Sequence, residues 1–328
     1  MDEKIRWGIL GPGNISHKFA TGFNVVENSE LYAVGSRDIG RANTFGDEYN
    51  IPIRYGSYHE LVSDPDVDAI YIATPHSFHK EHAMLCLSKG KAVLCEKPFS
   101  INATEAKEMV KCASENNVFL MEAMWTRFLP IYSQIQEWIK EGSIGDIRMI
   151  TADFGFRTTF NPEGRLFRPE LGGGALLDVG IYTISLVSFI LGGKSPSRIS
   201  SMANLGKSGV DEQSAMILGY EDGEMAILYT AINTNTKQEA VILGEKGSIS
   251  IPSFWNATSA ILKVDGEKEH IVEMSHKANG YCYEAEEVNR CLREGKIESH
   301  RMSWSESISI METMDEIRRQ WGLKYPME

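Results

Sequence analysis

The segment IRWGILGPGNIS, residues 5–16, decides the fold of the N-terminal half of the chain. Its first six residues form an apolar run typical of a buried strand, and Gly11-Pro-Gly13 then marks a turn. Gly11 permits a tight turn, Gly13 lets a ligand approach the backbone, and the small Ser16 allows a helix to pack closely. The segment therefore predicts a strand, a turn and a helix whose N-terminus offers free N–H groups to an anion.

Short apolar runs alternate with helical patterns up to about residue 123, which is typical of βαβ units and a parallel sheet. We expect strands near 30–36, 69–73, 91–95 and 118–121, with helices near 14–26, 39–49 and 77–87. A further helix begins after Asn102, which caps it with Glu105 as the capping-box partner.

The pattern changes after residue 124. We expect a helix at 130–141, a strand at 148–156, an apolar helix ending at 191, and two final helices near 283–293 and 304–320. About six alternating runs between 197 and 274, separated by Gly-rich turn signals, predict an antiparallel sheet. The predicted fold class is α/β. An N-terminal doubly wound Rossmann sheet (1–123) precedes a C-terminal α+β domain (124–328) with an open, largely antiparallel sheet.

Composition excludes several classes of protein. The 328 residues are 42% hydrophobic and 24% charged, which is typical of a globular protein. The net charge of −12 argues against a nucleic-acid surface. The five cysteines lack C-x-x-C spacing, and the apolar run 181–191 is shorter than the ~18 residues of a membrane span. We expect a cytoplasmic protein without a signal peptide, a membrane span or a nucleic-acid partner.

The strand–turn–helix context of the glycine turn predicts a dinucleotide site. We expect Gly11, Gly13, Asn14 and Ile15 to contact the diphosphate. An NAD site usually has an acidic residue about 20 positions after the motif.

At that position this chain has Ser36 followed by Arg37, a pair that suits the 2′-phosphate of NADP. Arg37 could also lie flat against the adenine ring. Asp38 could serve the ribose of NAD instead, so NADP is favoured and NAD remains an alternative.

Two further motifs carry chemistry. Glu96-Lys97-Pro98 follows the strand 91–95, where a parallel sheet binds its ligands, and Lys97 is expected to point into that cleft. Asp178 and Tyr182 lie four residues apart on the helix after Gly172-Gly-Gly, which places both on one face. An aspartate in an apolar helix needs a partner, either Lys97 or a substrate hydroxyl.

These motifs together resemble the glucose–fructose oxidoreductase, inositol dehydrogenase and rhizopine catabolism (Gfo/Idh/MocA) family over essentially the whole chain. The residues that carry the resemblance are Gly11-x-Gly13, Ala73-Thr-Pro75-His76-x-x-His79, Glu96-Lys97-Pro98 and Gly173-Gly-Ala-Leu-Leu-Asp178-x-Gly-x-Tyr182. Tyr182, where many members have His, and Met124-Trp125-Thr-Arg127-Phe128 are similar to the branch of dimeric dihydrodiol and NADP-dependent D-xylose dehydrogenases.

The resemblance implies hydride transfer between NADP and a secondary alcohol or carbonyl of a sugar, polyol or cyclic diol. Tyr182 would be the acid/base, Lys97 its activator and Asp178 the group that orients Lys97. Tyrosine is a poor base at its ordinary pKa near 10, and a nearby ammonium favours the phenolate. The implied cofactor contacts are Thr74, Pro75, His76, His79, Glu96, Lys97, Trp125 and Arg127.

Several candidate residues keep two interpretations. Trp125, Phe154 and Phe160 could form an apolar wall for a substrate or belong to the core. Arg148, Arg157, Arg165 and Arg168 could bind substrate or cofactor groups, or form surface salt bridges. His76, His79 and His82 are expected to bind no metal, because no Cys or carboxylate completes the set.

Two alternative functions remain open from the sequence. One is an inositol or anhydro-sugar dehydrogenase or reductase that uses NAD, and the other is a non-catalytic cofactor-binding regulator of the same fold. The open sheet predicted for the C-terminal half would expose one broad face, so we expect a homodimer or a higher homo-oligomer.

Overall fold

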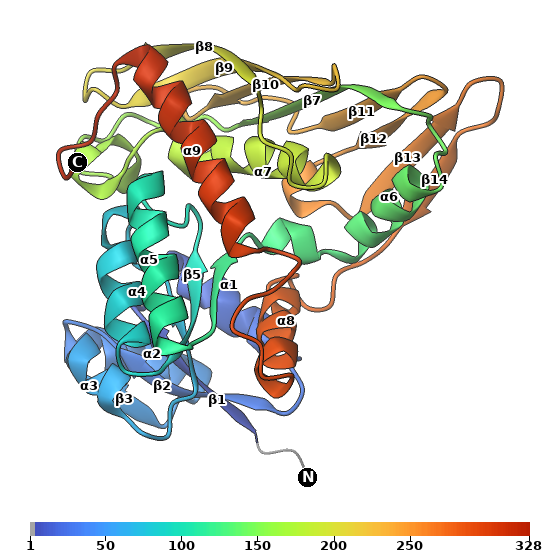
Figure 1. Ribbon diagram of the computed structural model, residues 1–328. Coiled ribbons are helices and arrows are strands. Elements are labelled where there is room, and N and C mark those ends of the chain that lie inside the picture. The colour runs from blue at the N-terminus through green and yellow to red at the C-terminus, as the bar shows by residue number, and fades with distance from the viewer. Residues whose placement is uncertain (1–3) are drawn as a thin grey trace. The chain divides into compact units, whose positions relative to one another are not determined.

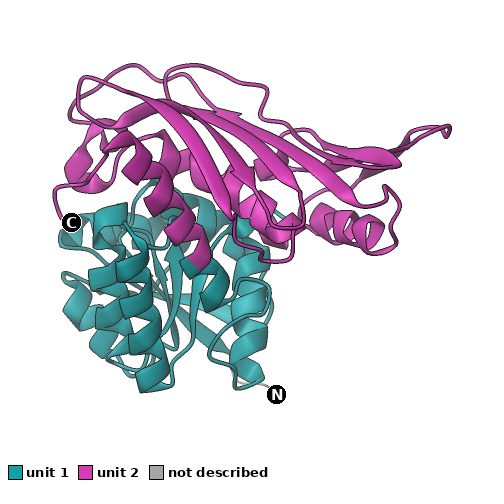
Figure 2. Ribbon diagram, turned by 45° about the horizontal axis from the view of Figure 1, so that its top comes forward, with its two compact units in different colours: residues 1–125, 277–308 teal, residues 126–276, 309–328 magenta. Residues whose placement is uncertain are grey.

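The computed structural model describes residues 4–328 and separates the chain into two compact units (Figures 1 and 2). Unit 1 comprises Met1–Trp125 with Lys277–Ile308, and unit 2 comprises Thr126–His276 with Ser309–Glu328. The chain therefore returns to unit 1 after the second sheet, a feature that a single boundary after residue 123 does not include.

Unit 1 contains a six-stranded parallel sheet in the order β3-β2-β1-β4-β5-β6, which confirms the Rossmann arrangement. The strands are β1 (Ile5–Leu10), β2 (Ser29–Gly35), β3 (Ile53–Tyr55), β4 (Ala69–Ile72), β5 (Ala92–Glu96) and β6 (Leu120–Ala123). The helices are α1 (Asn14–Phe23), α2 (Ile39–Tyr49), α3 (Tyr58–Ser63), α4 (His79–Leu87), α5 (Ala103–Asn116) and α8 (Cys282–Arg293).

Trp7 of β1 anchors the core of this unit. Its buried ring packs on Phe19 and Phe23 of α1, with both ring centroids 5.7 Å away. Its indole N–H donates to Oδ1 of Asn289 (3.0 Å), so α8 belongs to the same core. The strand order reverses between β1 and β4, and ligands of such sheets bind beyond the carboxyl ends of the strands at that point.

Unit 2 contains an eight-stranded sheet in the order β14-β13-β12-β11-β7-β10-β9-β8. The strands are β7 (Ile147–Gly155), β8 (Arg198–Leu205), β9 (Asp211–Gly219), β10 (Met225–Ala231), β11 (Ala240–Gly244), β12 (Gly247–Ile251), β13 (Ser259–Val264) and β14 (His270–Glu273). The helices are α6 (Pro130–Lys140) and α7 (Ile181–Ile190), and α9 (Trp304–Trp321) runs from unit 1 into unit 2. The largely antiparallel sheet is confirmed, with β7 and β10 as its parallel pair.

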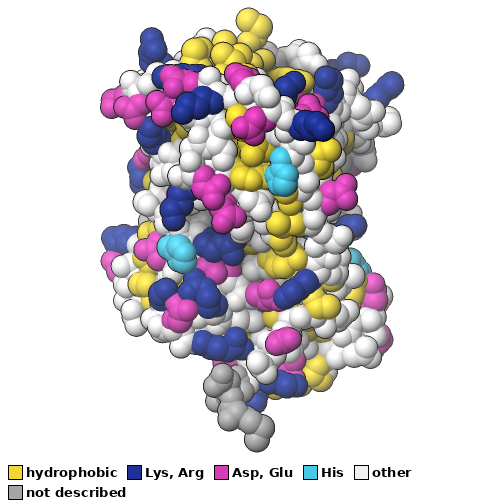
Figure 3. All heavy atoms as spheres, turned by 90° about the vertical axis from the view of Figure 1, so that its right-hand side faces the viewer, with side chains coloured by type: hydrophobic (Ala, Val, Ile, Leu, Met, Phe, Trp, Pro, Cys, Tyr) yellow, Lys and Arg dark blue, Asp and Glu magenta, His cyan; other side chains and the backbone are white. Residues whose placement is uncertain are grey.

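The two faces of this sheet differ in burial. Alternate residues of β9 and β10 point inward and are buried, as Leu218 and Leu228 are. The residues between them remain exposed although they are apolar: Ile217 is 45%, Ile227 38% and Tyr229 41% exposed. Figure 3 shows hydrophobic side chains gathered at the top of the view.

One helical stretch, Pro169–Ile190, is long and apolar enough to cross a membrane by length and composition alone. It is longer than the apolar run 181–191 expected from the sequence. The structure buries 94% of its most apolar window, as the core helix of a soluble protein does.

Candidate functional site

The turn between β1 and α1 is shaped for close approach by a ligand. Gly11 adopts a φ of +92°, in the region that glycine enters readily and other residues rarely adopt. A Cβ at Gly11 would lie 2.9 Å from Cγ2 of Thr74, so a larger residue requires a shift. The buried Ser16 hydroxyl donates to the Gly11 carbonyl (2.7 Å) and holds the turn against the helix.

The N-terminus of α1 fits a diphosphate. Gly13 is its N-cap, and within residues 4–328 no side chain caps the first turn. The N–H groups of that turn, which include those of Asn14 and Ile15, therefore point toward the ligand side together with the positive end of the helix dipole. These residues suit the diphosphate of a dinucleotide.

Ser36 and Asp38, at the end of β2, have different hydrogen-bond partners. Ser36 is buried, and its hydroxyl accepts a hydrogen bond from the N–H of Asp38 (3.2 Å). The Asp38 carboxylate accepts from the N–H of Gly40 (2.8 Å) and so caps α2. The carboxylate that could have served a ribose is thus engaged by the helix.

Two exposed arginines lie beside the same strand end. Arg41 donates to the carbonyl of Pro12 (3.0 Å). Its guanidinium therefore lies at the glycine turn between β1 and α1. The Arg37 guanidinium lies 5.9 Å from the ring centroid of Phe78. Burial raises the pKa of Tyr58, and the positive charges of Arg37 and Arg41 act against that shift. The phenol of Tyr58 therefore lies near both arginines. Sequence reasoning missed Arg41, although its spacing of four from Arg37 was a usable signal.

His79 joins the loops that follow β4 and β5. Its ring is fully buried, with Nδ1 2.8 Å from the carbonyl oxygen of Pro98 and Nε2 2.9 Å from that of Thr74. Burial lowers the pKa of His79 to about 4, and the hydrogen bonds to the two carbonyl oxygens act against that shift. The ring thus ties two loops together at the carboxyl edge of the sheet, and the expected cofactor contact of His79 stays a prediction.

The other histidines of this segment have different surroundings. His76 is buried, with its ring centroid 5.7 Å from that of His79, and Pro75 precedes it as the N-cap of a short helical turn. Nδ1 of His82 lies 2.9 Å from Oγ1 of Thr74. Within residues 4–328, no group of three His, Cys, Asp or Glu could hold a metal ion.

Lys97 follows β5 at the carboxyl edge of the sheet and is half-buried. Its N–H donates to Oε2 of Glu96 (3.1 Å), and the hydroxyl of Tyr71 donates to Oε1 of the same carboxylate. Trp125 stacks on Tyr281, with the centroids 4.5 Å apart and the planes 12° apart. Unit 1 thus brings together the predicted Glu96 and Lys97, and adds Tyr71 and Tyr281, which sequence reasoning missed.

Unit 2 places Asp178 and Tyr182 on one helical stretch. Residues Leu176–Gly180 form a π-helical turn that leads into α7, so the helix is wider here than the regular spacing predicts. Asp178 and Tyr182 are 7% and 8% exposed. Arg165 donates to Oδ1 of Asp178 (2.8 Å), which gives this carboxylate a partner the sequence did not single out.

Aromatic side chains surround Tyr182. Its ring lies 5.4 Å from that of Phe154, and Phe154 stacks on Trp255 with centroids 5.1 Å and planes 15° apart. The Trp255 indole N–H donates to Gln238 (2.8 Å), which fixes its plane. Trp255 lies far from the other candidates in the chain, and no motif marked it.

A second layer holds the glycine loop before this helix. The carboxylate of Asp211, the first residue of β9, accepts from the N–H of Leu176 (2.7 Å). The Tyr325 hydroxyl donates to the carbonyl of Gly173 (2.6 Å). Burial raises the pKa of Asp211 to about 7, despite the opposing effect of the backbone N–H donors. Both residues come from chain segments distant from the loop.

Three predicted contacts have other roles in the structure. Arg148 pairs with Glu245 on the surface, at the opposite end of β7 from Phe154. Arg127 is buried and donates to the hydroxyl and the carbonyl of Ser185 (both 3.0 Å), which ties it to α7. Phe160 is 43% exposed and packs edge-on against Phe167. Arg148 therefore forms a surface salt bridge, one of the two interpretations that the sequence leaves open.

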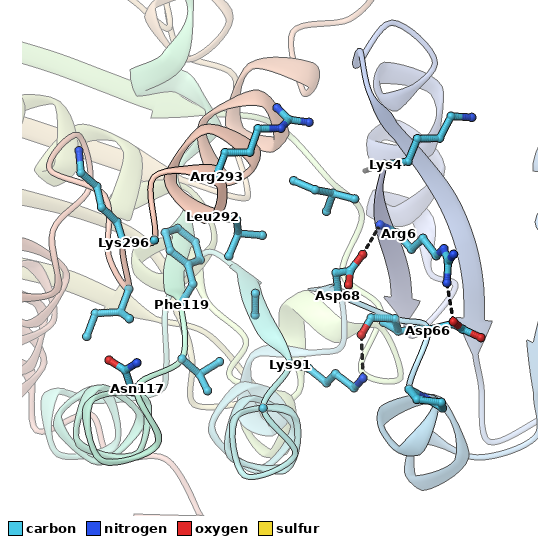
Figure 4. Close-up of a pocket in the computed structure, with 18 residues that line it drawn as sticks. Lys4, Arg6, Asp66, Asp68, Lys91, Asn117, Phe119, Leu292, Arg293 and Lys296 are labelled. Carbon is cyan, nitrogen blue, oxygen red and sulfur yellow. Dashed lines mark hydrogen bonds and ion pairs between the residues drawn. The ribbon is translucent and has the colours of Figure 1, made fainter. Parts of the chain in front are cut away.

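A cavity of about 740 Å³ lies at the other edge of the unit 1 sheet, at the amino ends of its strands (Figure 4). Its cations already have partners. Arg6 pairs with Asp66, and the Lys91 ammonium donates to the carbonyls of Asp64 (2.6 Å) and Val67 (2.7 Å). The cavity is thus built around internal pairs and does not replace the glycine turn as the cofactor site.

Comparisons with known proteins agree with this fold. Residues 5–124 match the model of an oxidoreductase family with an NAD-binding Rossmann fold, and residues 132–250 match a GFO/IDH/MocA C-terminal domain. The chain is 40% identical to a trans-1,2-dihydrobenzene-1,2-diol dehydrogenase of Xenopus laevis, with 98% of this chain and 99% of that one covered.

Two solved structures show the same fold. An aldose-aldose oxidoreductase from Caulobacter crescentus has a TM-score of 0.89 at 23% identity, covering 98% of this chain and 99% of that one. A 3-ketoreductase from Actinomadura kijaniata, solved with NADP and TDP-benzene, has a TM-score of 0.85 at 23% identity and covers 97% and 98%. The family models, which together match most of the chain, and the full-length relative establish that this protein belongs to the GFO/IDH/MocA family of oxidoreductases.

Proposed function

We propose that this protein is an NADP-dependent oxidoreductase that transfers a hydride between the nicotinamide and a secondary alcohol or carbonyl of a sugar, polyol or cyclic diol. The observation that carries the proposal is the glycine turn with an uncapped helix N-terminus, in a chain 40% identical to a diol dehydrogenase along its length.

Three side chains share the chemistry in this proposal. Tyr182 takes the hydroxyl proton when an alcohol is oxidised and returns it when a carbonyl is reduced. The Lys97 ammonium favours the phenolate of Tyr182 and donates to the reacting oxygen. The nicotinamide, when bound, accepts or supplies the hydride. Asp178, held by Arg165, orients the Lys97 ammonium and the substrate hydroxyls.

The stacked rings of Phe154 and Trp255, here called the aromatic wall, support a sugar or a cyclic diol as the substrate. Phe154 and Trp255 present a stacked pair beside Tyr182, and flat aromatic faces suit the C–H faces of such rings. Arg165 and Asp178 add one donor and one acceptor for hydroxyl groups. Aromatic faces together with a hydroxyl donor and acceptor favour polyhydroxylated rings over simple alcohols.

A substrate panel tests the proposal. Purified protein is mixed with pentoses, hexoses, polyols and cyclic diols, and the absorbance of the reduced nicotinamide is followed with both cofactors. Turnover that is faster with NADP supports the proposal. Turnover of inositols or anhydro-sugars with NAD selects the first alternative, and NADPH quenching of tryptophan fluorescence without any turnover selects a cofactor-binding regulator.

The arginines beside β2 predict the cofactor preference. Replacing Arg41 by Ala should raise the KM for NADPH roughly ten- to a hundredfold, the range that one charged hydrogen bond to phosphate carries. Arg37→Ala should act in the same direction, and the KM for NADH should change little because NADH lacks the 2′-phosphate. Steady-state kinetics with both cofactors measure the effect.

Arg54 provides the matched control. It lies on β3 and pairs with Asp47, so Arg54→Ala removes an arginine of unit 1 that has its own ion pair. Its KM values for the two cofactors should remain in the wild-type ratio. Equal losses with NADPH and NADH in the Arg41 variant would contradict the 2′-phosphate contact.

The exposed apolar face of the unit 2 sheet supports a homo-oligomer. Ile217 and Ile227 are direct neighbours across β9 and β10, and Tyr229 and Met202 add to the same face. A contiguous apolar surface of this kind marks an interaction site. We expect a homodimer or a higher homo-oligomer in light scattering, and Ile227→Lys should shift the mass toward the monomer.

Val25→Lys is the control for that substitution. Val25 is a similarly exposed apolar residue (43%) of unit 1, away from the sheet of unit 2. It should leave the mass unchanged. A wild-type protein that is monomeric at micromolar concentration would refute the expected association. We also propose a cytoplasmic location, in keeping with five free cysteines.

A further inference from the structure

Residues 322–328, which follow helix α9, fold back onto that helix within unit 2. The N–H of Leu323 donates to the carbonyl of Arg318 (3.0 Å), so the chain turns directly after the helix ends. Leu323 is 8% exposed and Tyr325 only 1%. The segment is therefore part of the packed structure of unit 2.

A buried ion pair holds this segment. The Glu328 carboxylate accepts from both terminal nitrogens of Arg318, at 2.7 Å and 2.9 Å, and from the N–H of Tyr325 at 2.8 Å. The Arg318 side chain is 4% exposed and the Glu328 side chain 13%, so solvent ions screen the pair little. The Arg318 guanidinium also lies 5.0 Å from the centroid of the Tyr325 ring. Arg318 and Glu328 thus contact both the backbone and the ring of Tyr325.

The Tyr325 hydroxyl contacts the peptide group between Gly173 and Gly174. It donates to the carbonyl of Gly173 (2.6 Å), and on the other side of that peptide the N–H of Gly174 donates to the carbonyl of Leu166 (2.9 Å). The N–H of Gly173 donates to the carbonyl of Arg168 (3.0 Å). The peptide is therefore held between Tyr325 and the segment that begins at Arg165.

This peptide links the two members of the Arg165–Asp178 ion pair. Leu166 directly follows Arg165, and the carbonyl of Gly174 accepts from the N–H of Asp178 (3.4 Å). The Arg165 guanidinium in turn donates to Oδ1 of Asp178 (2.8 Å). A shift of the peptide would therefore move the backbone beside both charged groups.

We propose that Tyr325 is a positioning residue that sets the Arg165–Asp178 pair through the Gly173–Gly174 peptide, with Arg318 and Glu328 holding Tyr325 in place. The consequence for catalysis rests on the proposed function, in which Asp178 orients the Lys97 ammonium and the substrate hydroxyls. The support of the loop by Tyr325 lies within unit 2 and does not depend on that function.

Hydrogen exchange of the full chain measures this support. Tyr325→Phe removes the hydroxyl and keeps the ring beside Arg318. Amide exchange in residues 165–178 should become roughly three- to tenfold faster than in the wild type, the factor that one neutral hydrogen bond carries. Unchanged exchange in this segment would overturn the proposal.

Tyr132→Phe is the matched control for hydrogen exchange. Tyr132 is also buried in unit 2, and its hydroxyl donates to a different backbone carbonyl, that of Phe254. This variant should leave exchange in residues 165–178 at the wild-type rate. Equal acceleration of that segment in Tyr132→Phe and Tyr325→Phe would overturn the proposal, because a general loosening of unit 2 would then explain both results.

Glu328→Ala tests how Tyr325 is held. Arg318 keeps Asp315 as a partner (2.7 Å), so the buried guanidinium retains a carboxylate. Exchange in residues 165–178 should again become faster. Adding Tyr325→Phe to Glu328→Ala should change it little further, because the two substitutions act through one contact.

Glu316→Ala is the control for that substitution on the same helix. Glu316 pairs with Arg319, whose side chain is 72% exposed. The loss of this surface pair should leave exchange in residues 165–178 unchanged. Fully additive effects of Glu328→Ala and Tyr325→Phe would overturn the role of Glu328.

Kinetics on the substrate found by the panel separate positioning from a general loss of stability. Tyr325→Phe should lower kcat roughly three- to tenfold. The KM for the cofactor should stay nearly unchanged, because the proposed phosphate contacts at the glycine turn belong to unit 1. Faster exchange with wild-type kcat would overturn the positioning role. A protein without turnover would refute the proposed function, while hydrogen exchange would still decide whether Tyr325 holds the loop.

Discussion

Replacing Tyr182 by Phe should lower kcat roughly 10²–10⁴-fold, the usual contribution of general acid–base catalysis. The substitution removes one oxygen and keeps the ring against Phe154, so the aromatic wall remains. The glycine turn, Arg37 and Arg41, which we propose bind the cofactor, belong to unit 1 and are untouched. NADPH binding, followed by quenching of protein fluorescence, should therefore stay close to that of the wild type while turnover falls.

Tyr132→Phe is the control for this result. Tyr132 is a buried tyrosine of the same unit, and its hydroxyl donates to the carbonyl of Phe254 (2.5 Å). Its loss should reduce the melting temperature and leave kcat near the wild-type value. Full activity in Tyr182→Phe would move the acid/base role to Lys97, because both ring nitrogens of His79 already face backbone carbonyls.

The features that the sequence predicts best are encoded within one short stretch of chain. The helix 39–49 has the expected ends, and Asn102 caps its helix by accepting from the N–H of Glu105 (2.9 Å). The glycine turn and Ser16 likewise lie within six residues of one another. Local geometry of this kind depends on neighbours in the sequence, so a motif is enough to predict it.

The supporting groups of the site could not be found in this way. Asp211 reaches Leu176 across 35 positions, and Tyr325 reaches Gly173 across 152. Trp255, in the segment between β12 and β13, stacks on Phe154 of β7. Tyr281 stacks on Trp125 within unit 1, although residues 126–276 of unit 2 lie between them in the chain. The local sequence around each of these supporting residues shows no motif. Its contact forms only because the fold brings together segments that are far apart in the chain.

Arg148 shows how position along a strand bears on two interpretations that the local sequence leaves open. The sequence groups it with Arg157, Arg165 and Arg168, as a donor to substrate or cofactor groups or as part of a surface salt bridge. It lies six positions before Phe154. A strand rises about 3.3 Å per residue, so the two positions are about 20 Å apart along β7. Arg148 therefore meets Glu245 at the end of β11, while Phe154 meets Tyr182. Two residues of one strand share a site only if they lie close together along the strand and on the same face of the sheet.

Replacing Gly174 by Ala should displace the loop before the helix that bears Asp178 and Tyr182. Gly174 has a φ of +113°, and a Cβ there would lie 2.2 Å from Oδ1 of the buried Asp211. The backbone strain is worth about 1–2 kcal/mol, and displacing Asp211 from the N–H of Leu176 costs about 1.5–3 kcal/mol more. We expect a fall in melting temperature of roughly 6–12 °C together with a large loss of kcat.

Gly223→Ala separates the two causes of that loss. Gly223 has a φ of +95° in a turn of the same unit, but a Cβ there would meet nothing within 4 Å. It therefore carries the backbone strain without the collision, and it should cost less stability and no activity. Matching losses of stability in the two variants, with kcat retained in both, would show that Asp211 yields to the methyl group and that the helix bearing Asp178 and Tyr182 keeps its place. A loss of kcat confined to Gly174→Ala would instead show that Asp211 holds this helix in register for the reaction.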